Sequence, residues 1–503
     1  MPVPADYYAL LGLPRDATLD EVRQAYHHSA LRLHPDVNME TGDTELFLDI
    51  QRAYEILCDP DLKAKYDHQL PKQDFLSPPL DINLLYSRNG LPRLNEPQLV
   101  YALINLSPPR LEEIAESAPL NVCLVLDRST SMQGERMDTV KNTAIEIVRQ
   151  LRRQDLLSIV TFSDRAEVLI PAGRRMDRAS IETQVQMIMT GGATEMFRGL
   201  DAGYQEIRAS YKKKYINHLI LITDGRTYGD EAHCLRIADQ AAARGIGISS
   251  LGIGEEWNDS FLDNIASRTG GSCAYIAKST DIRRILKEKF LGLSRIYAEN
   301  VRFDFHLGKD VELRYAFRLG PETAPLESEP PISMGSVPVD GSLTIILEFK
   351  IPRLPEKVNQ VALANGQIVM EIPTLTSPTS VTRLRLSRPV RDDIVPEEPP
   401  PTTLINALSR LTLYRIQEHA NLEIVRGNTV MATQHLHNLA THLFSHGESD
   451  LAQTVLEEAL NLEQGHHFSE EGKKRIKYGT RGLMLPASVD DDLSLIAPGV
   501  ESI

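Results

Sequence analysis

The chain has 503 residues, which corresponds to about three domains at roughly 150 residues per domain. Hydrophobic residues make up 42% and charged residues 24%, enough apolar material to bury several cores, so wholesale disorder is excluded. The 69 acidic residues exceed the 54 lysines and arginines, and the resulting net charge of -15 argues against a general nucleic-acid binder.

The cysteines and the N-terminus predict a reducing compartment and no membrane span. Cys58, Cys123, Cys234 and Cys273 lie far apart and form no C-x-x-C pair, which disfavours a zinc ribbon and a disulfide framework. The first residues contain neither the basic segment nor the apolar segment of a secretory signal. Since no run of about 18 apolar residues occurs, we expect a cytoplasmic protein without a transmembrane helix.

Residues 5–68 have the pattern of a compact helical unit. Thr18 and Glu21 form a capping box that opens an amphipathic helix, and a second such helix begins near Asp43. The tripeptide His34-Pro35-Asp36 lies between the two. Because proline disfavours helix in the residue before it, the tripeptide is expected at the tip of a helical hairpin.

This segment resembles the J-domain (DnaJ-like) family over its whole length. The tripeptide is preceded by Asp6-Tyr7-Tyr8 and followed, at the end of the segment, by Tyr66-Asp67, as in that family. The resemblance implies four helices and a face that docks on a DnaK-class heat-shock ATPase and stimulates its ATP hydrolysis. The residues implied for this contact are His34, Pro35, Asp36, Arg23, His27, His28 and Arg32.

Three positions of this segment depart from the family pattern. Relatives usually carry Arg or Lys where this chain has His27 and His28, and Lys where it has Val37. An unperturbed histidine is mostly neutral near pH 7, so the docking face is less positive than usual. The alternative interpretation is a J-like hairpin that has lost the ATPase contact, while the intact tripeptide favours a working domain.

Residues 69–97 contain several prolines and little periodicity, which predicts a linker. The segment is not the Gly/Phe-rich linker of the better-known J-proteins, and their cysteine-rich zinc module is absent from the sequence. Residues 98–117 open with the strand-like run QLVYALINL. Any client-binding equipment must therefore lie further along the chain.

Residues 118–296 alternate apolar strands with amphipathic helices. The run at 122–126 is continuously apolar, as expected of a strand buried on both faces of a parallel sheet. Further strands are predicted at 157–162, 219–222 and 246–251. Such alternation predicts a doubly wound α/β domain with its site at the carboxyl ends of the strands.

Polar side chains follow two of these strands. The first strand leads into a D-x-S-x-S motif formed by Asp127, Ser129 and Ser131, and the strand at 219–222 leads into Asp224. Thr194 follows two glycines that let the backbone turn it inward. Carboxylate and hydroxyl oxygens suit Mg²⁺ or Mn²⁺ better than zinc, and such a set can leave one coordination position for an outside ligand.

Together, D-x-S-x-S, G-G-x-T and T-D-G resemble the von Willebrand factor A (VWA) family and its metal-ion-dependent adhesion site. The resemblance implies a metal bound by Asp127, Ser129, Ser131, Thr194 and Asp224, with a carboxylate of a partner protein at the free position. Thr130 stands where relatives commonly carry glycine, which should affect loop flexibility and not metal binding. The alternative is that these Asp and Ser side chains merely cap helices.

An antiparallel β module is predicted on both sides of the α/β domain. Alternating runs at 311–315, 343–349 and 381–386 lie within residues 297–390, and 98–117 supplies a further strand. The α/β domain is therefore expected to be inserted into a β-sandwich. The proline-rich stretch 391–403 predicts a second linker, and 487–503 predicts a disordered tail.

Residues 404–486 have a helical pattern interrupted by Gly427, Gly447 and Gly465. One tetratricopeptide-like unit can be traced, but a solenoid needs about three, which favours a generic helical cap. His435, His442 and His446 share a helix face without an accompanying carboxylate or cysteine, so they are interpreted as solvated histidines rather than as a zinc site. The fold class is thus multidomain: an all-α J-domain, an α/β VWA domain, a flanking β module and a C-terminal helical region.

The sequence contains no phosphate loop, nucleophile elbow or zinc-protease motif, so the protein is not expected to be an enzyme. The favoured function is a co-chaperone whose J-domain activates the ATPase and whose VWA domain holds a partner or client through a Mg²⁺-bridged carboxylate. The alternative is a metal-dependent scaffold with a weak or non-stimulating J-domain. A metal-dependent hydrolase is a third hypothesis, and it requires turnover that vanishes in Asp127→Ala or Asp224→Ala.

Overall fold

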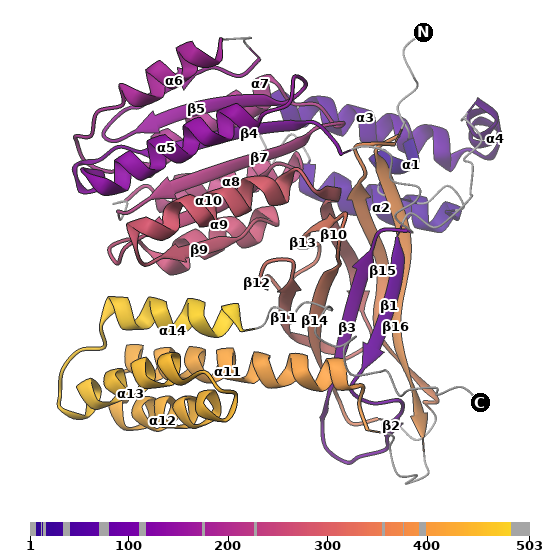
Figure 1. The fold of residues 1–503 in the computed structure, drawn as a ribbon. Helices are drawn as coiled ribbons and strands as arrows, with labels where there is room; N and C mark the ends of the chain where they lie inside the picture. Colours follow the sequence, from indigo (N-terminus) through magenta and orange to yellow (C-terminus); the bar gives the residue numbers. More distant parts are fainter. Residues whose placement is uncertain are drawn as a thin grey trace, which may run out of the picture.

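The computed structural model describes residues 7–11, 13, 17–33, 41–69, 80–109, 117–173, 177–225, 229–354, 358–375, 377–391 and 399–483. Figure 1 shows four parts: an N-terminal helical unit, an α/β domain, a pair of packed β-sheets and a C-terminal set of helices. The multidomain architecture expected from the sequence is thus confirmed. Among the described helices, none combines the length and the apolar character that a membrane span requires.

The N-terminal unit consists of α1 (Tyr7–Leu10), α2 (Leu19–Leu33), α3 (Thr41–Cys58) and α4 (Pro60–Gln69). Val22 of α2 and Leu57 of α3 are fully buried, as their amphipathic spacing predicts. Tyr66 closes the unit, because its hydroxyl accepts a hydrogen bond of 2.8 Å from the backbone N–H of Tyr7. The tripeptide at 34–36 lies outside the described residues.

A six-stranded sheet with the order β6-β5-β4-β7-β8-β9 forms the middle of the α/β domain. Neighbouring strands run parallel except β6, which pairs antiparallel with β5. Every residue of β4 and β7 is buried, in agreement with their continuous apolar runs. The strands are β4 (Leu120–Asp127), β5 (Leu156–Phe162), β6 (Ala166–Ile170), β7 (Ile216–Thr223), β8 (Gly247–Ile253) and β9 (Cys273–Ile276).

Helices cover both faces of this sheet, which confirms the doubly wound arrangement. One apolar core joins the sheet to α5 (Glu135–Gln150), α6 (Arg178–Gln186) and α10 (Ser279–Leu293). A second core joins the opposite face to α7 (Met196–Ala209), α8 (Glu231–Ala243) and α9 (Asp259–Thr269). The carboxyl ends of the parallel strands therefore meet at one edge that the helices leave accessible.

Two five-stranded sheets pack face to face beside the α/β domain and share one core. Within the first sheet, β3 lies next to β14, although the whole α/β domain separates them in the sequence. The α/β domain is therefore inserted into a β-sandwich, as expected. The first sheet contains, in order, β1 (Asp81–Tyr86), β3 (Gln98–Ser107), β14 (Leu343–Ile351), β11 (Glu312–Gly320) and β12 (Ala324–Leu326). The second contains β13 (Ile332–Pro338), β10 (Ile296–Leu307), β15 (Gln360–Glu371), β16 (Thr379–Arg391) and β2 (Leu91–Pro92).

The interpretation of residues 69–97 as a linker is wrong for residues 80–97. β1 pairs antiparallel with β3, and β2 extends the second sheet at the edge of β16. The prolines near these short strands interrupt the alternation that identifies a strand in the sequence, and proline is tolerated at a sheet edge. These residues form strands because they pair with distant segments, which the local sequence does not predict.

The C-terminal part consists of α11 (Thr402–Val425), α12 (Thr429–Ser445), α13 (Ser449–Glu463) and α14 (Glu470–Gly482). Three glycines follow α11, α12 and α13. Their φ values are +76° at Gly427, +82° at Gly447 and +78° at Gly465. Left-handed backbone at these positions ends each helix, as their placement predicts. Residues 484–503, including the expected disordered tail, lie outside the described residues.

Helix α14 joins the C-terminal part to the α/β domain, and Figure 1 shows it between that domain and the other C-terminal helices. Arg481 forms two hydrogen bonds of 2.7 Å to the carboxylate of Asp263 in α9. Lys477 binds the same carboxylate at 2.8 Å and also binds Asp259. The expected helical cap thus packs on the α/β domain through buried charge pairs of α14, and on the first β-sheet through an apolar cluster that includes Leu411 and Tyr414 of α11.

Candidate metal centre at the carboxyl edge of the central sheet

The two carboxylates of the predicted metal set lie at the ends of adjacent parallel strands. Asp127 is the last residue of β4, and Asp224 directly follows β7. The register pairs Leu126 with Ile222, so the two strands end side by side. Both residues are buried, with 0% and 1% of their surface exposed.

Hydroxyl groups surround these carboxylates. One oxygen of Asp127 accepts a hydrogen bond from the backbone N–H of Ser129 at 2.8 Å, and the other accepts from the hydroxyl of Thr223 at 2.7 Å. Ser131 donates its hydroxyl to Asp224 Oδ1 at 2.7 Å and lies 3.1 Å from the Ser129 hydroxyl oxygen. The strand-end loops thus bring both aspartates and both serines of the predicted set together.

Thr194 reaches the same edge from the loop before α7. A Cβ atom built on Gly225, next to Asp224, would lie 2.9 Å from Thr194 Oγ1, so glycine provides the room for that hydroxyl. Gly192, with φ of +88°, accepts hydrogen bonds from the backbone and side chain of Thr130 at 3.2 Å. All five predicted side chains therefore lie at one edge of the sheet.

The electrostatics of the site favour a cation. Burial raises the pKa of Asp127 to about 6, hydrogen bonds from Thr223 and Ser129 oppose that rise, and the neighbouring Asp224 adds to it. A divalent cation between the two carboxylates would offset their desolvation. The donors are two carboxylates and three hydroxyls, a hard-oxygen set that suits Mg²⁺ or Mn²⁺. In the described part of the chain, no cluster of three or more His, Cys, Asp or Glu side chains forms an alternative metal site.

One charged residue at this site was not anticipated from the sequence. Arg136, in the first turn of α5, binds Asp224 Oδ2 through its Nη1 at 2.6 Å. A cation in the first turn of a helix opposes the helix dipole, and this unfavourable placement is the only local signal of a role for Arg136. Its partner lies 88 residues further along the chain, so only the fold shows the pair.

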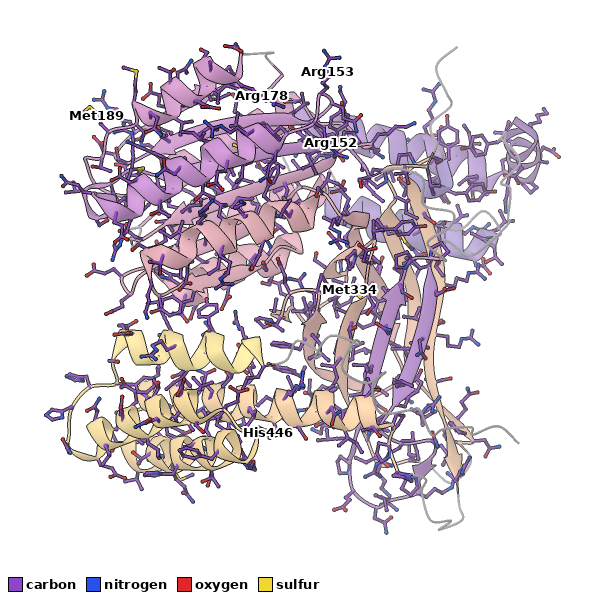
Figure 2. All side chains as sticks on the ribbon, viewed as in Figure 1. Arg152, Arg153, Arg178, Met189, Met334 and His446 are labelled. Carbon is purple, nitrogen blue, oxygen red and sulfur yellow. The ribbon has the colours of Figure 1, made fainter. Side chains whose placement is uncertain are left out.

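Exposed methionines border the metal edge. Met187 and Met189 are 73% and 80% exposed and lie just before the loop that carries Thr194. Together with Arg128 they line a cavity of about 340 Å³ beside the D-x-S-x-S loop. Figure 2 shows Met189 at the end of the α/β domain opposite Arg152, which shortly precedes β5. Polarizable apolar side chains of this kind suit contact with a partner surface.

The predicted ATPase-docking face is described only in part. Arg23 and His27 are exposed on α2, and Arg23 lies 3.4 Å from the carboxylate of Asp20. His28 and Arg32 continue the same helix, but their side chains lie outside the described residues. His34, Pro35 and Asp36 lie outside them entirely.

Three family models match separate parts of the chain. The DnaJ domain matches residues 6–67, and the von Willebrand factor type A domain matches residues 121–288. The "Sll0103-like, C-terminal alpha-helical domain" matches residues 402–486. The first two matches confirm the resemblances found in the sequence, and the third describes the helices α11 to α14.

Two curated relatives show how far these similarities extend. The "Uncharacterized protein sll0103" of Synechocystis sp. is 26% identical over 385 residues, which cover 74% of this chain and 90% of that protein. A "Chaperone protein DnaJ" of Gloeothece citriformis is 52% identical over 65 residues, which cover 13% of this chain. Those residues span only 17% of that DnaJ protein, so the similarity to it is confined to the N-terminal unit.

Two solved structures share most of the fold. A "von Willebrand factor type A from Catenulispora acidiphila" has a TM-score of 0.62 at 15% identity, covering 81% of this chain and 98% of the other. The "ArnB paralog VWA2 from Sulfolobus acidocaldarius" has a TM-score of 0.55 at 17% identity, with coverage of 81% and 100%. The chain therefore carries a DnaJ domain at its N-terminus and a von Willebrand factor type A domain at its centre, within the multidomain fold described above.

Proposed function

We propose that the protein is a J-domain co-chaperone that stimulates a DnaK-class heat-shock ATPase and holds a partner or client protein through a metal-dependent VWA site. The observation that carries this proposal is the combination, in one chain, of an intact His34-Pro35-Asp36 in a J-domain and a gathered set of metal-binding side chains. The J-domain alone would account only for ATPase activation, and the metal site alone only for binding a protein. Together they connect ATPase activation to the capture of a protein.

At the metal edge, Asp127, Ser129, Ser131, Thr194 and Asp224 would hold Mg²⁺ or Mn²⁺. When bound, the ion supplies a Lewis-acidic position for a carboxylate of the partner protein. The protein itself buries the two aspartates, orients their oxygens with hydrogen bonds from hydroxyls and keeps the loop of Thr194 close through glycines. This work is binding and positioning, and we propose no catalytic turnover.

We place the protein in the cytoplasm together with its ATPase partner. All four cysteines carry free thiols, which fits a reducing compartment. Cys123, Cys234 and Cys273 are buried, and burial raises the pKa of each thiol, so all three are inert packing residues.

The second candidate function is a metal-dependent scaffold whose J-domain does not stimulate an ATPase. It is favoured by His27, an exposed histidine at a position where relatives of the J-domain family usually carry a permanent positive charge. Histidine lacks the permanent positive charge of arginine or lysine, so the docking face carries less fixed positive charge than is usual in the family. The two functions differ in one measurable quantity, the rate of ATP hydrolysis by the partner.

The test is single-turnover ATP hydrolysis by DnaK-class ATPases from several paralogous groups, with the intact protein and with Asp36→Asn. We expect stimulation by the intact protein and its loss in Asp36→Asn, because that carboxylate belongs to the implied docking tripeptide. As a matched control, Asp67→Asn changes a carboxylate at the end of the same domain that accepts a hydrogen bond from Tyr8 and should retain stimulation. No stimulation of any paralogue by the intact protein would leave the scaffold function.

A further inference from the structure

The ion pair between Arg136 and Asp224 is unusual because of where each partner lies. The side chain of Asp224 is 0% exposed, and the side chain of Arg136 is 40% exposed, so the guanidinium caps a buried carboxylate at the entrance of the metal edge. A Cβ atom built on Gly254 would lie 3.0 Å from Arg136 Nη2, so the loop after β8 also closes on the guanidinium. The guanidinium is therefore held in place on two sides.

The two carboxylate oxygens of Asp224 have different partners. Oδ1 accepts the hydroxyl of Ser131 and faces the cluster of predicted metal-binding groups, while Oδ2 is engaged by Arg136. A metal ion on the Oδ1 side need not displace Arg136. The guanidinium and the ion can then be present together, with one carboxylate between them.

The net charge of the proposed metal site is the sum of the charges on its side chains and on the ion. Asp127 and Asp224 contribute two negative charges when both are ionised, and Arg136 contributes one positive charge. A divalent cation then brings the total to +1, whereas the same site without Arg136 would be neutral. The next charges around the edge are Asp164 and the two arginines that interact with it, Arg165 and Arg128; they are present with or without Arg136, so Arg136 still raises the total by one charge.

We infer that Arg136 is a fixed counter-cation of the metal site, which weakens metal binding and leaves the loaded site with a net positive charge that selects an anionic side chain of the partner. This inference rests on the proposed metal-dependent function and states why its ligand is a carboxylate rather than a neutral hydroxyl or amide. Arg136 acts through Asp224 and through its charge, so it is a positioning and specificity residue.

The inference predicts two effects of opposite sign in Arg136→Gln. Glutamine can still donate a hydrogen bond to Asp224, but it carries no charge. Removing a positive charge a few ångströms from the ion should tighten Mn²⁺ binding by about tenfold, and it should weaken the binding of an anion to the loaded site by a similar factor. A side chain that only orients Asp224 would not change the two affinities in opposite directions.

The experiment uses the full chain and two probes, Mn²⁺ alone and then acetate at saturating Mn²⁺. Free Mn²⁺ is followed by its electron paramagnetic resonance signal, and acetate binding by the fall in water proton relaxivity as acetate displaces a coordinated water. Arg136→Lys keeps the charge and should behave like the wild type. Arg149→Gln removes an arginine of the same helix that pairs with Glu182 away from the site, and it should change neither affinity.

Unchanged or weaker Mn²⁺ binding in Arg136→Gln, or unchanged acetate binding, would overturn the inference while leaving the metal site intact. Mn²⁺ binding by Arg136→Gln but not by the wild type would also overturn the inference, because Arg136 would then exclude the ion instead of coexisting with it. Failure of both proteins to bind Mn²⁺ would overturn the proposed metal function together with the inference. Asp127→Ala serves as the reference that lacks the site.

Discussion

At the scale of single residues, the metal edge is built from groups that are unfavourable unless they meet a cation. Asp127 is buried beside Asp224, and burial raises the pKa of Asp127 to about 6. Two desolvated carboxylates repel one another, and among the described residues hydroxyl donors, the backbone N–H of Ser129 and the guanidinium of Arg136 offset this repulsion. This arrangement is the physical basis of the divalent-cation site that we propose.

The first prediction concerns Asp127. Mg²⁺ that binds only the folded protein stabilises it by about 2.7 kcal/mol at a hundred times its dissociation constant, which raises the Tm of a domain of this size by roughly 5–11 °C. We expect Asp127→Ala to remove this Mg²⁺-dependent rise, measured by thermal unfolding with and without Mg²⁺. A variant that keeps the full rise would place the ion elsewhere.

At the scale of elements, α14 is attached to the α/β domain by charges rather than by an apolar face alone. Lys474 and Arg481 are 0% and 3% exposed, and their partners include the backbone oxygen of Glu255 and the carboxylate of Asp263. Removing one partner of a buried pair is costly because the other charge stays buried. The docking of α14 on the α/β domain therefore depends on a few side chains.

The second prediction concerns Arg481. We expect Arg481→Met to weaken the docking of α14 by about 3 kcal/mol, because Asp263 then keeps only Lys477 as a partner. Trp257, the only tryptophan of the chain, packs against Tyr478 of α14 with ring centroids 5.8 Å apart and reports the event by a red shift of its emission. Arg475→Met removes an exposed cation of the same helix and should leave the emission unchanged.

The third prediction concerns how the docking of α14 depends on pH through Asp259. Burial alone would raise the pKa of Asp259, but Lys477 and Lys473 outweigh it and lower the pKa to about 2. A carboxyl group with a lowered pKa in the folded state stabilises that state fully above about pH 4, and the contribution is lost as the pH falls toward 2. Trp257 emission should therefore report undocking over this range.

The matched variant for the acid titration is Asp259→Asn. It should undock more easily at neutral pH, because Lys477 loses a partner, and its undocking should depend less steeply on pH between 4 and 2. An identical pH profile in the two proteins would show that Asp259 does not contribute to docking. Hydrogen exchange of the α14 amides gives the same comparison without relying on fluorescence.

At the scale of the whole molecule, the J-domain and the metal edge point away from each other. Met189 marks the metal edge at one end of the α/β domain in Figure 2, and the helices α1 to α4 lie at the opposite side of the same view in Figure 1. The β-sandwich lies next to both parts in the same view. In the proposed function, this arrangement would let one protein engage an ATPase and a client at the same time without competition.

The fourth prediction follows from that separation. Asp36→Asn should abolish ATPase stimulation while keeping the Mg²⁺-dependent rise in Tm, and Asp127→Ala should do the reverse in the absence of client. Both quantities are measured on the same two preparations. Loss of stimulation in Asp127→Ala without client would show instead that the metal site and the J-domain communicate.

The sequence by itself determined the parts whose information is local. Capping, helical spacing and apolar runs predict α2, α3, β4 and β7, because these patterns depend on residues within a few positions of one another. The D-x-S-x-S motif is local in the same sense, whereas the full set of five proposed metal-binding residues came from the resemblance to the VWA family and from the expectation that neighbouring parallel strands end at one edge. The family resemblances then supply the two domains that the comparisons support.

Only the tertiary structure decided the contacts between distant segments. β1 and β2 form strands because they pair with β3 and β16, which lie elsewhere in the chain. Arg136 binds Asp224, 88 residues away, and Arg481 of α14 binds Asp263, 218 residues away. None of these pairs produces a periodic pattern in the sequence. The partner of a single charge or of a short strand depends on which distant segment the fold places next to it. The identity of the proposed metal-binding residues is thus a property of the sequence, whereas the charge of their site is a property of the fold.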